Sequence, residues 1–199
     1  MKKNLQSILM TGMFMLAGMT SWAQIVFLVN SPSNLAGSYN FTYSSSNGWG
    51  ANMDTVALTA QAAFAYDGTA ADSLGCDDIV NTGDITGKIA VVYRGSCNFS
   101  LKALNVQDSG AVACVIINNV SGGPVGMGAG SFAANVHIPV VMISDTDGAL
   151  LRDAIMAGDV EIFLGHNTGL FAHNLGAYRS HLGMPNSLSL PSAVAESST

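Results

Sequence analysis

The chain has 199 residues, 49% of them hydrophobic and only 10% charged, with a formal net charge of −6. Charged residues are well below the ~25% usual for soluble domains, so uncharged polar side chains must form much of the surface. An acidic chain with seven basic residues lacks the electrostatic footprint of a nucleic-acid-binding protein. Its length suits one domain with its own hydrophobic core.

Residues 1–23 have the organisation of a secretory signal peptide. Lys2 and Lys3 form a basic start, an apolar run follows over residues 5–19, and Ser21 and Ala23 are small residues at the −3 and −1 positions. The alternative is an uncleaved membrane anchor, but this run is shorter than the roughly 20 residues of a spanning helix. We expect bacterial export with cleavage after Ala23 and no membrane span afterwards. Losing both lysines would bring the net charge to −8.

The first part of the exported chain predicts short strands separated by turns. Ile25 to Val29 is expected to be a strand, and the turn-rich Ser31-Pro32-Ser33-Asn34 follows it. Gln61 to Tyr66 is strand or helix, because a six-residue apolar run does not distinguish the two.

Gly87 to Asn119 is the most informative segment, because it has the pattern of strand, turn, helix and strand. Apolar β-branched residues follow Gly87, and Phe99, Ala103 and Val106 then recur at helical spacing. Residues 112–117 form a continuous apolar run, as in a strand that is buried on both faces. We expect a right-handed βαβ unit.

A helix and a closing strand are predicted after Ser144. Ser144 and Asp147 have the spacing of a capping box, Gly158 ends the helix, and residues 160–164 form the strand. Residues 165–199 carry few charges and scattered Gly and Pro. We expect this part to be an extension or linker toward downstream domains that the chain does not contain.

Several of these motifs together resemble the protease-associated (PA) domain family. They are GKIAVVYRG from Gly87, the Cys97-x-Phe99 pair, Lys102-Ala103, Asn105, Gly110-Ala111, VIINN ending at Asn119, and IPVVMIS from Ile138. The resemblance covers residues 76–164 and implies a PA-like domain over residues 24–164. Its expected fold is α/β, a small sheet or sandwich flanked by two helices.

The resemblance also implies a pairing for two of the three cysteines. Cys76 and Cys97 lie in loop-like surroundings, at places where PA domains commonly have paired cysteines. Cys114 lies inside the apolar run 112–117 and is expected to be a small buried hydrophobic residue. We therefore expect a Cys76–Cys97 disulfide and a free Cys114.

Motifs that suggest catalysis have simpler structural explanations. Asp108-Ser109-Gly110 matches an aspartic peptidase signature, but that mechanism needs a second motif, and Asp145-Thr146-Asp147-Gly148 does not supply it. The segment Gly128-x-Gly130 lacks the following helix that a dinucleotide site requires. Cys114 with His137 is a conceivable nucleophile pair, but burial predicts an inert thiol.

The histidines predict no metal site. His166, His173 and His181 are spaced unlike zinc ligands on a helix or in a finger, and no H-E-x-x-H motif is present. We expect neither a metal nor another cofactor.

We therefore expect an exported, non-enzymatic module that binds a peptide or protein, or that controls access to a neighbouring domain. The alternatives are the accessory part of a secreted peptidase and a spacer in a surface adhesin. Tyr93, Arg94 and Gly95, at the end of a strand, are the candidate binding residues. Arg94 either recognises a carboxylate or pairs with an acid such as Asp77.

Overall fold

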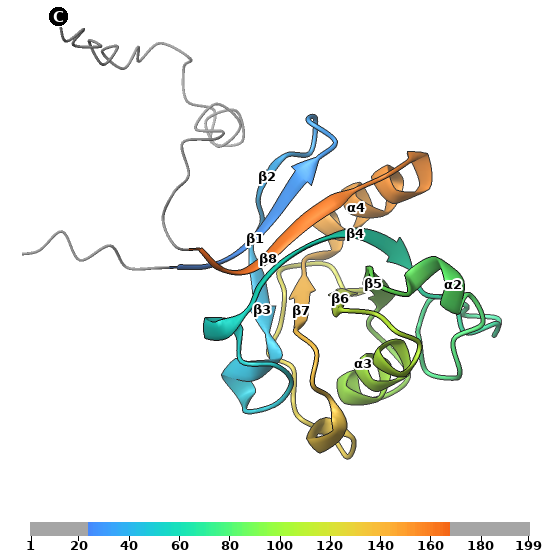
Figure 1. Ribbon diagram of the computed structural model, residues 1–199. Helices are drawn as coiled ribbons and strands as arrows, with labels where there is room; N and C mark the ends of the chain where they lie inside the picture. Colours follow the sequence, from blue (N-terminus) through green and yellow to red (C-terminus); the bar gives the residue numbers. More distant parts are fainter. Residues whose placement is uncertain (1–23, 168–199) are drawn as a thin grey trace, which may run out of the picture.

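The computed structural model describes residues 24–167, and the predicted signal peptide and the tail from residue 168 lie outside them. Figure 1 shows a strongly curled sheet with helices packed on it. Its eight strands have the order β2-β1-β8-β4-β5-β6-β7-β3. They span Gln24–Ser31 (β1), Gly37–Ser38 (β2), Phe41–Tyr43 (β3), Ala57–Phe64 (β4), Ile89–Tyr93 (β5), Ala113–Ile117 (β6), Val140–Ile143 (β7) and Glu161–Asn167 (β8).

Three α-helices and three 3-10 turns complete the described part of the chain. The α-helices are α2 (Thr82–Ile85), α3 (Phe99–Asp108) and α4 (Asp145–Ala157), and the 3-10 turns are η1 (Ser44–Asn47), η2 (Met53–Thr55) and η3 (Ala133–Asn135). The expectation of a mixed α/β fold is confirmed.

The sheet has a parallel part and an antiparallel part. Strands β4, β5, β6 and β7 are parallel, with Ile89 opposite Ala113 in the β5–β6 pair and Cys114 opposite Val140 in the β6–β7 pair. Strand β8 pairs antiparallel with both β1 and β4, and β3 pairs antiparallel with β7. The segment Gln61 to Tyr66, undecided from sequence, contains the end of β4.

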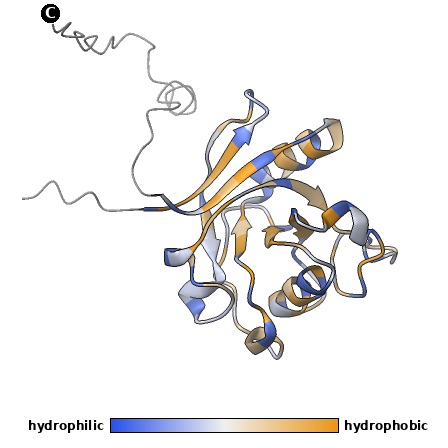
Figure 2. Cartoon of the chain, viewed as in Figure 1, coloured by the Kyte–Doolittle hydropathy of each residue, from blue (hydrophilic) through white to orange (hydrophobic). Residues whose placement is uncertain are grey.

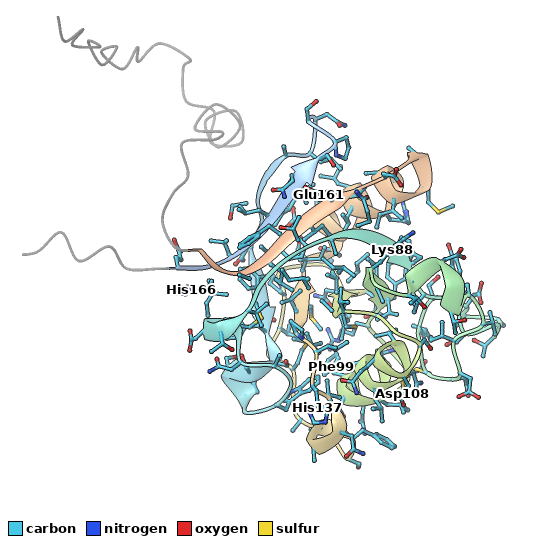
Figure 3. The ribbon with its side chains drawn as sticks, in the orientation of Figure 1. Lys88, Phe99, Asp108, His137, Glu161 and His166 are labelled. Carbon is cyan, nitrogen blue, oxygen red and sulfur yellow. A yellow bond between two sulfur atoms is a disulfide. The ribbon has the colours of Figure 1, made fainter. Side chains whose placement is uncertain are left out.

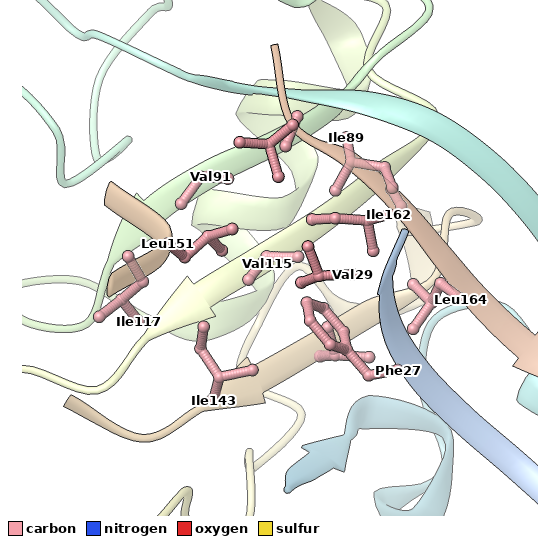
Figure 4. Close-up of a cluster of buried hydrophobic side chains, with 14 of the residues drawn as sticks. Phe27, Val29, Ile89, Val91, Val115, Ile117, Ile143, Leu151, Ile162 and Leu164 are labelled. Carbon is pink, nitrogen blue, oxygen red and sulfur yellow. The ribbon is translucent and has the colours of Figure 1, made fainter. Parts of the chain in front are cut away.

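The parallel strands are buried on both faces, which explains their continuous apolar sequence. One face packs against β1, β8 and α4, and Figure 4 shows Phe27, Val115, Leu151 and Ile162 in this cluster. The other face packs against α3 and α2 through residues that include Ala103 and Ile85. Figure 2 shows hydrophobic residues along the central strands and a mixture of hydrophobic and hydrophilic residues on the helices.

Helix α3 follows β5 and helix α4 follows β7, and both end close to the glycines predicted to terminate them. Ser144 is the N-cap of α4 and its hydroxyl accepts a 2.9 Å hydrogen bond from the backbone N–H of Asp147, while Gly158 is the C-cap. Helix α3 connects the parallel strands β5 and β6. The right-handedness of this unit stays a prediction.

Candidate functional site

The carboxyl ends of the parallel strands bring several loops to one edge of the sheet. Strands β4, β5, β6 and β7 end at Phe64, Tyr93, Ile117 and Ile143, and α4 begins two residues after β7. This edge is where sheets of this kind place ligands, because the loops there vary without disturbing the core. The predicted binding residues Tyr93, Arg94 and Gly95 lie on this edge, at the end of β5.

Arg94 is held by the scaffold. Its Nη1 donates a 2.9 Å hydrogen bond to Oδ1 of Asn118, and its backbone N–H donates to the carbonyl of Ile117. Asn118 is 3% exposed and donates in turn to the carbonyl of Gly123. Arg94 therefore holds the loop after β6 in place, and its partner is Asn118 rather than the suggested Asp77.

Gly95 has a backbone conformation that favours glycine. Its φ is +125°, and a Cβ atom there would lie 3.1 Å from Nδ2 of Asn119. Ser96 follows with φ +62°, also in the left-handed region. The turn that leads to Cys97 is thus a tight and specific one, and Gly95 shapes it rather than presenting a binding group.

Tyr93 belongs to an open aromatic pocket that we call the β4–β5 pocket. It is lined by Phe64, Tyr66, Ser73, Tyr93, Arg152 and Met156 and has a volume of about 270 Å³. The ring of Phe64 stacks against Tyr66 at 6.4 Å and against Tyr93 at 5.8 Å between centroids. Three aromatic rings, from the ends of β4 and β5 and from Tyr66 just after β4, therefore form a continuous wall.

Helix α4 adds a cation and a flexible apolar side chain to this pocket. Arg152 and Met156 are four residues apart and lie on one face of the helix. Met156 is 70% exposed, with its Sδ 4.0 Å from the hydroxyl of Tyr66. Arg152 forms a 2.7 Å ion pair with Asp153. Hydrogen bonds to Asp153 and Tyr93 raise the pKa of Arg152 above its ordinary value, so the guanidinium is always charged.

A second polar cluster lies beside the disulfide between Cys76 and Cys97. Lys102 of α3 is fully buried, and its Nζ donates to the carbonyl of Leu74 at 2.6 Å and to Sγ of Cys76 at 3.3 Å. Burial lowers the pKa of Lys102 to about 8, although Coulombic interactions with Cys114 and Asp67 oppose the shift. A buried lysine on this helix was not evident from the sequence.

Asp67 supports the same cluster from the loop after β4. Its Oδ2 accepts a 3.0 Å hydrogen bond from the backbone N–H of Cys76, and its Oδ1 accepts from Thr69. Burial raises the pKa of Asp67, but these hydrogen bonds outweigh it and lower the pKa below its ordinary value. The carboxylate is therefore ionised, and its hydrogen bond to the backbone of Cys76 holds that segment in position.

The residues that suggested catalysis lie on different elements and form no site together among the described residues. Figure 3 shows Asp108 at the end of α3, His137 near η3 and His166 at the end of β8. Cys114 is a free, buried thiol, and burial raises its pKa to about 12, while His137 is exposed. This thiol stays protonated at neutral pH and cannot act as a nucleophile.

His173 and His181, the other two histidines of the suggested zinc set, lie outside the described residues. Between residues 24 and 167, the structure has no group of three His, Cys, Asp or Glu side chains placed to hold a metal ion. The same part of the chain has no helix with the length and apolar character needed to cross a membrane.

Comparison with known proteins identifies one matching family and several solved structures with a similar fold. The model of the PA domain family matches residues 53–151. Similar solved structures include an aminopeptidase from Aneurinibacillus sp. strain AM-1 (20% identity, TM-score 0.51) and BSAP, a zinc aminopeptidase from Bacillus subtilis (24% identity, TM-score 0.50). A third is a peptidase M28 precursor from Shewanella amazonensis SB2B (18% identity, TM-score 0.51). No curated protein sequence matches the chain.

The chain spans about a third of the length of these solved structures. The three alignments cover 72%, 73% and 72% of this chain but 30%, 30% and 34% of the other chains. At these identities the similarity shows the fold alone.

Proposed function

Because residues 53–151 of this chain are a PA domain, we propose that the protein is a non-catalytic, exported module that binds a peptide segment in the β4–β5 pocket. The single observation that supports this site is the combination of an aromatic wall with an exposed methionine and an arginine. The pocket is open, so an extended segment has access to it from solvent. Its ligand would be a segment of a protein substrate or of a neighbouring domain.

The chemistry of the pocket defines the class of ligand. The stacked rings of Phe64, Tyr66 and Tyr93 offer a flat apolar surface to an aliphatic or aromatic side chain. Met156 adapts its shape to different side chains because it is unbranched and exposed. We therefore propose that one apolar side chain of the peptide packs between the rings and Met156.

Arg152 would bind a carboxylate next to that side chain. Its present partner, Asp153, is a surface ion pair in which the two side chains are 47% and 68% exposed. Such exposed pairs are screened by solvent and contribute little to stability. Because the Arg152–Asp153 pair is weak, a carboxylate of the ligand can bind Arg152 beside Asp153 or in its place. The planar guanidinium favours two parallel hydrogen bonds to the ligand carboxylate.

Peptide capture should depend on Arg152 and on a free carboxylate. The probe is a library of acetylated hexapeptides with aromatic or aliphatic residues near a free C-terminus, compared with the same peptides amidated at that end. Hydrogen bonds between two charged groups are stronger than those between neutral ones, so Arg152→Ala should weaken the best binder about tenfold or more. Isothermal titration calorimetry measures the dissociation constant.

Two controls separate binding from scaffold effects. Lys88→Ala removes a cation at the amino end of β5, away from the pocket, and should leave binding unchanged. Arg94→Ala should lower the melting temperature through the loss of the Asn118 contact, with a smaller effect on binding. Equal affinity of acid and amide peptides, or an unaffected Arg152→Ala variant, would assign the pocket no role in carboxylate recognition.

We also propose that this chain has no hydrolytic activity by itself. The support is the inert Cys114, the position of Asp108 at a helix end and the absence of a serine elbow in the sequence. Purified chain incubated with casein and a mixed peptide library, with and without zinc or calcium, should release no products above the buffer control. Sustained cleavage that is abolished by Asp108→Ala or by a chelator would contradict this.

The second candidate function is the accessory part of a secreted peptidase whose catalytic domain lies outside this chain. The fold similarity to two aminopeptidases and a peptidase precursor favours it. In that case the pocket would hold a segment of the substrate or of the catalytic domain. Catalytic motifs in an extended reading frame would support this candidate, and repeated β-sandwich domains would support the adhesin spacer instead.

We also propose that the protein functions outside the cytoplasm. A disulfide between Cys76 and Cys97 is typical of proteins in oxidising surroundings. With the signal-peptide pattern of residues 1–23, this supports a bacterial protein that is secreted or displayed at the cell surface.

A further inference from the structure

Lys102 is a buried cation that points at a disulfide. The residue is fully buried, and the contacts of its Nζ are the carbonyl of Leu74 and Sγ of Cys76. Among residues 24–167, the structure has one ion pair, between Arg152 and Asp153, so no carboxylate lies within ion-pair distance of Lys102. An ammonium group in this position is only partly compensated for its lost hydration.

The oxidised sulfur is a poor partner for this cation, whereas a thiolate would be a good one. A disulfide sulfur is neutral and accepts hydrogen bonds weakly, but Sγ of Cys76 would carry a full negative charge after reduction, at about the same place. Asp67 and Cys114 are the other ionisable groups electrostatically coupled to Lys102. The carboxylate of Asp67 accepts hydrogen bonds from the backbone of Cys76 and from Thr69, and the buried thiol of Cys114 stays protonated.

The second sulfur lies at the start of a helix. Cys97 directly precedes Asn98, the N-cap of the ten-residue helix α3. The positive end of the helix dipole lowers the pKa of a thiol in this position. Lys102 favours the ionised form of Cys76 and the helix dipole favours that of Cys97, while the carboxylates of Asp67, Asp77 and Asp78, which line a pocket with Cys76, act against the Cys76 thiolate. Cys76 and Cys97 are each partly exposed to solvent.

We propose that the Cys76–Cys97 disulfide is redox-active, and that Lys102 stabilises the Cys76 thiolate that its reduction releases. The reductant is a thiol. Its thiolate attacks Sγ of Cys97, forms a mixed disulfide there and breaks the bond to Cys76, which leaves as a thiolate beside Lys102. A second thiol of the reductant then attacks the mixed disulfide and releases Cys97. The protein gains two electrons, and the reductant is oxidised to its disulfide.

The surrounding contacts do not depend on the disulfide. Nδ2 of Asn105 donates to the carbonyls of Gly75 and Asp77, and Lys102 holds the carbonyl of Leu74. Reduction therefore leaves the segment attached to α3. It yields a thiolate at Cys76, close in sequence to Ser73, which lines the β4–β5 pocket. This inference is independent of peptide binding at that pocket.

The first test compares the redox equilibria of Lys102→Met and wild type. The purified chain is equilibrated in mixtures of reduced and oxidised glutathione, quenched with acid, alkylated and weighed by mass spectrometry. We expect Lys102→Met to need about a tenfold higher [GSH]²/[GSSG] ratio for half-reduction. Lys88→Met, which removes the same charge just before the amino end of β5, should not change the ratio. A ratio for Lys102→Met equal to that of Lys88→Met would overturn the proposal.

The second test needs no variant, so it stays decisive if Lys102→Met does not fold. The reduced wild-type chain is treated briefly with iodoacetamide at a series of pH values, and the labelling of each cysteine is measured by peptide mass spectrometry. We expect labelling of Cys76 to reach half of its maximal rate at least one pH unit below the ~8.5 of an ordinary thiol. Cys114 should not react. A midpoint for Cys76 at or above 8.5 would overturn the proposal.

Discussion

Replacing both Cys76 and Cys97 by alanine should lower the free energy of unfolding by about 3 kcal/mol. The disulfide closes a loop between residues that are 21 positions apart, and the chain-entropy model gives this value for a loop of that length. The loop includes α2 and β5, so without the bond the unfolded chain gains freedom over a central part of the domain. Urea denaturation followed by circular dichroism measures the change.

Cys114→Ala is the matched control for this experiment. It also removes a sulfur, from a residue that is fully buried in β6, but it opens no loop. We expect it to cost about 1 kcal/mol through lost packing. A double variant that loses no more stability than Cys114→Ala would show that the disulfide contributes little to the fold.

Gly148→Ala should destabilise the domain by roughly 2 kcal/mol, although alanine is the better helix former. A Cβ atom on Gly148 would lie 2.1 Å from Cγ2 and 3.0 Å from Cβ of Ile117, which is 1% exposed at the end of β6. Relieving this overlap requires α4 to move away from the sheet, and overpacking of this kind costs about 1–3 kcal/mol. The gain in helix propensity is at most about 1 kcal/mol, so the clash dominates.

The same substitution should weaken peptide capture, because α4 carries Arg152 and Met156 to the β4–β5 pocket. Gly83→Ala in α2 is the control, since a Cβ there meets no atom within 4 Å. We expect that variant to be as stable as wild type or slightly more stable. Thermal unfolding of both variants, with calorimetric titration of the best hexapeptide, checks the prediction. A stable Gly148→Ala variant would show that α4 shifts freely on the sheet.

Local patterns in the sequence predicted the central elements well, because those elements are buried in a simple way. The apolar run at residues 112–117 predicted β6, whose residues are all buried. Ser144 and Gly158 predicted both ends of α4. Gln61 to Tyr66 was undecided because its strand conformation depends on partners that are distant in sequence, with Gln61 opposite Glu161 of β8 and residues 62–64 opposite Ile89–Val91 of β5.

The pocket was only partly predictable. Tyr93 was chosen because it ends a strand, but its aromatic neighbours come from the end of β4 and the residues just after it, and its cation from α4. The spacing of Arg152 and Met156 marks a helix face without showing which strand end that face meets. Burial of Lys102 was likewise hidden, because it depends on the loop around Cys76 that covers one side of α3.

The pairing of β1 with β8 brings the two ends of the described part of the chain together. Gln24 lies opposite Asn167 in the antiparallel ladder, so the described part starts and stops at one point on the surface, as Figure 1 shows. Paired residues across such a ladder have Cα atoms about 5 Å apart. A host protein would therefore accept the whole unit in place of a surface turn, with little displacement of its own backbone.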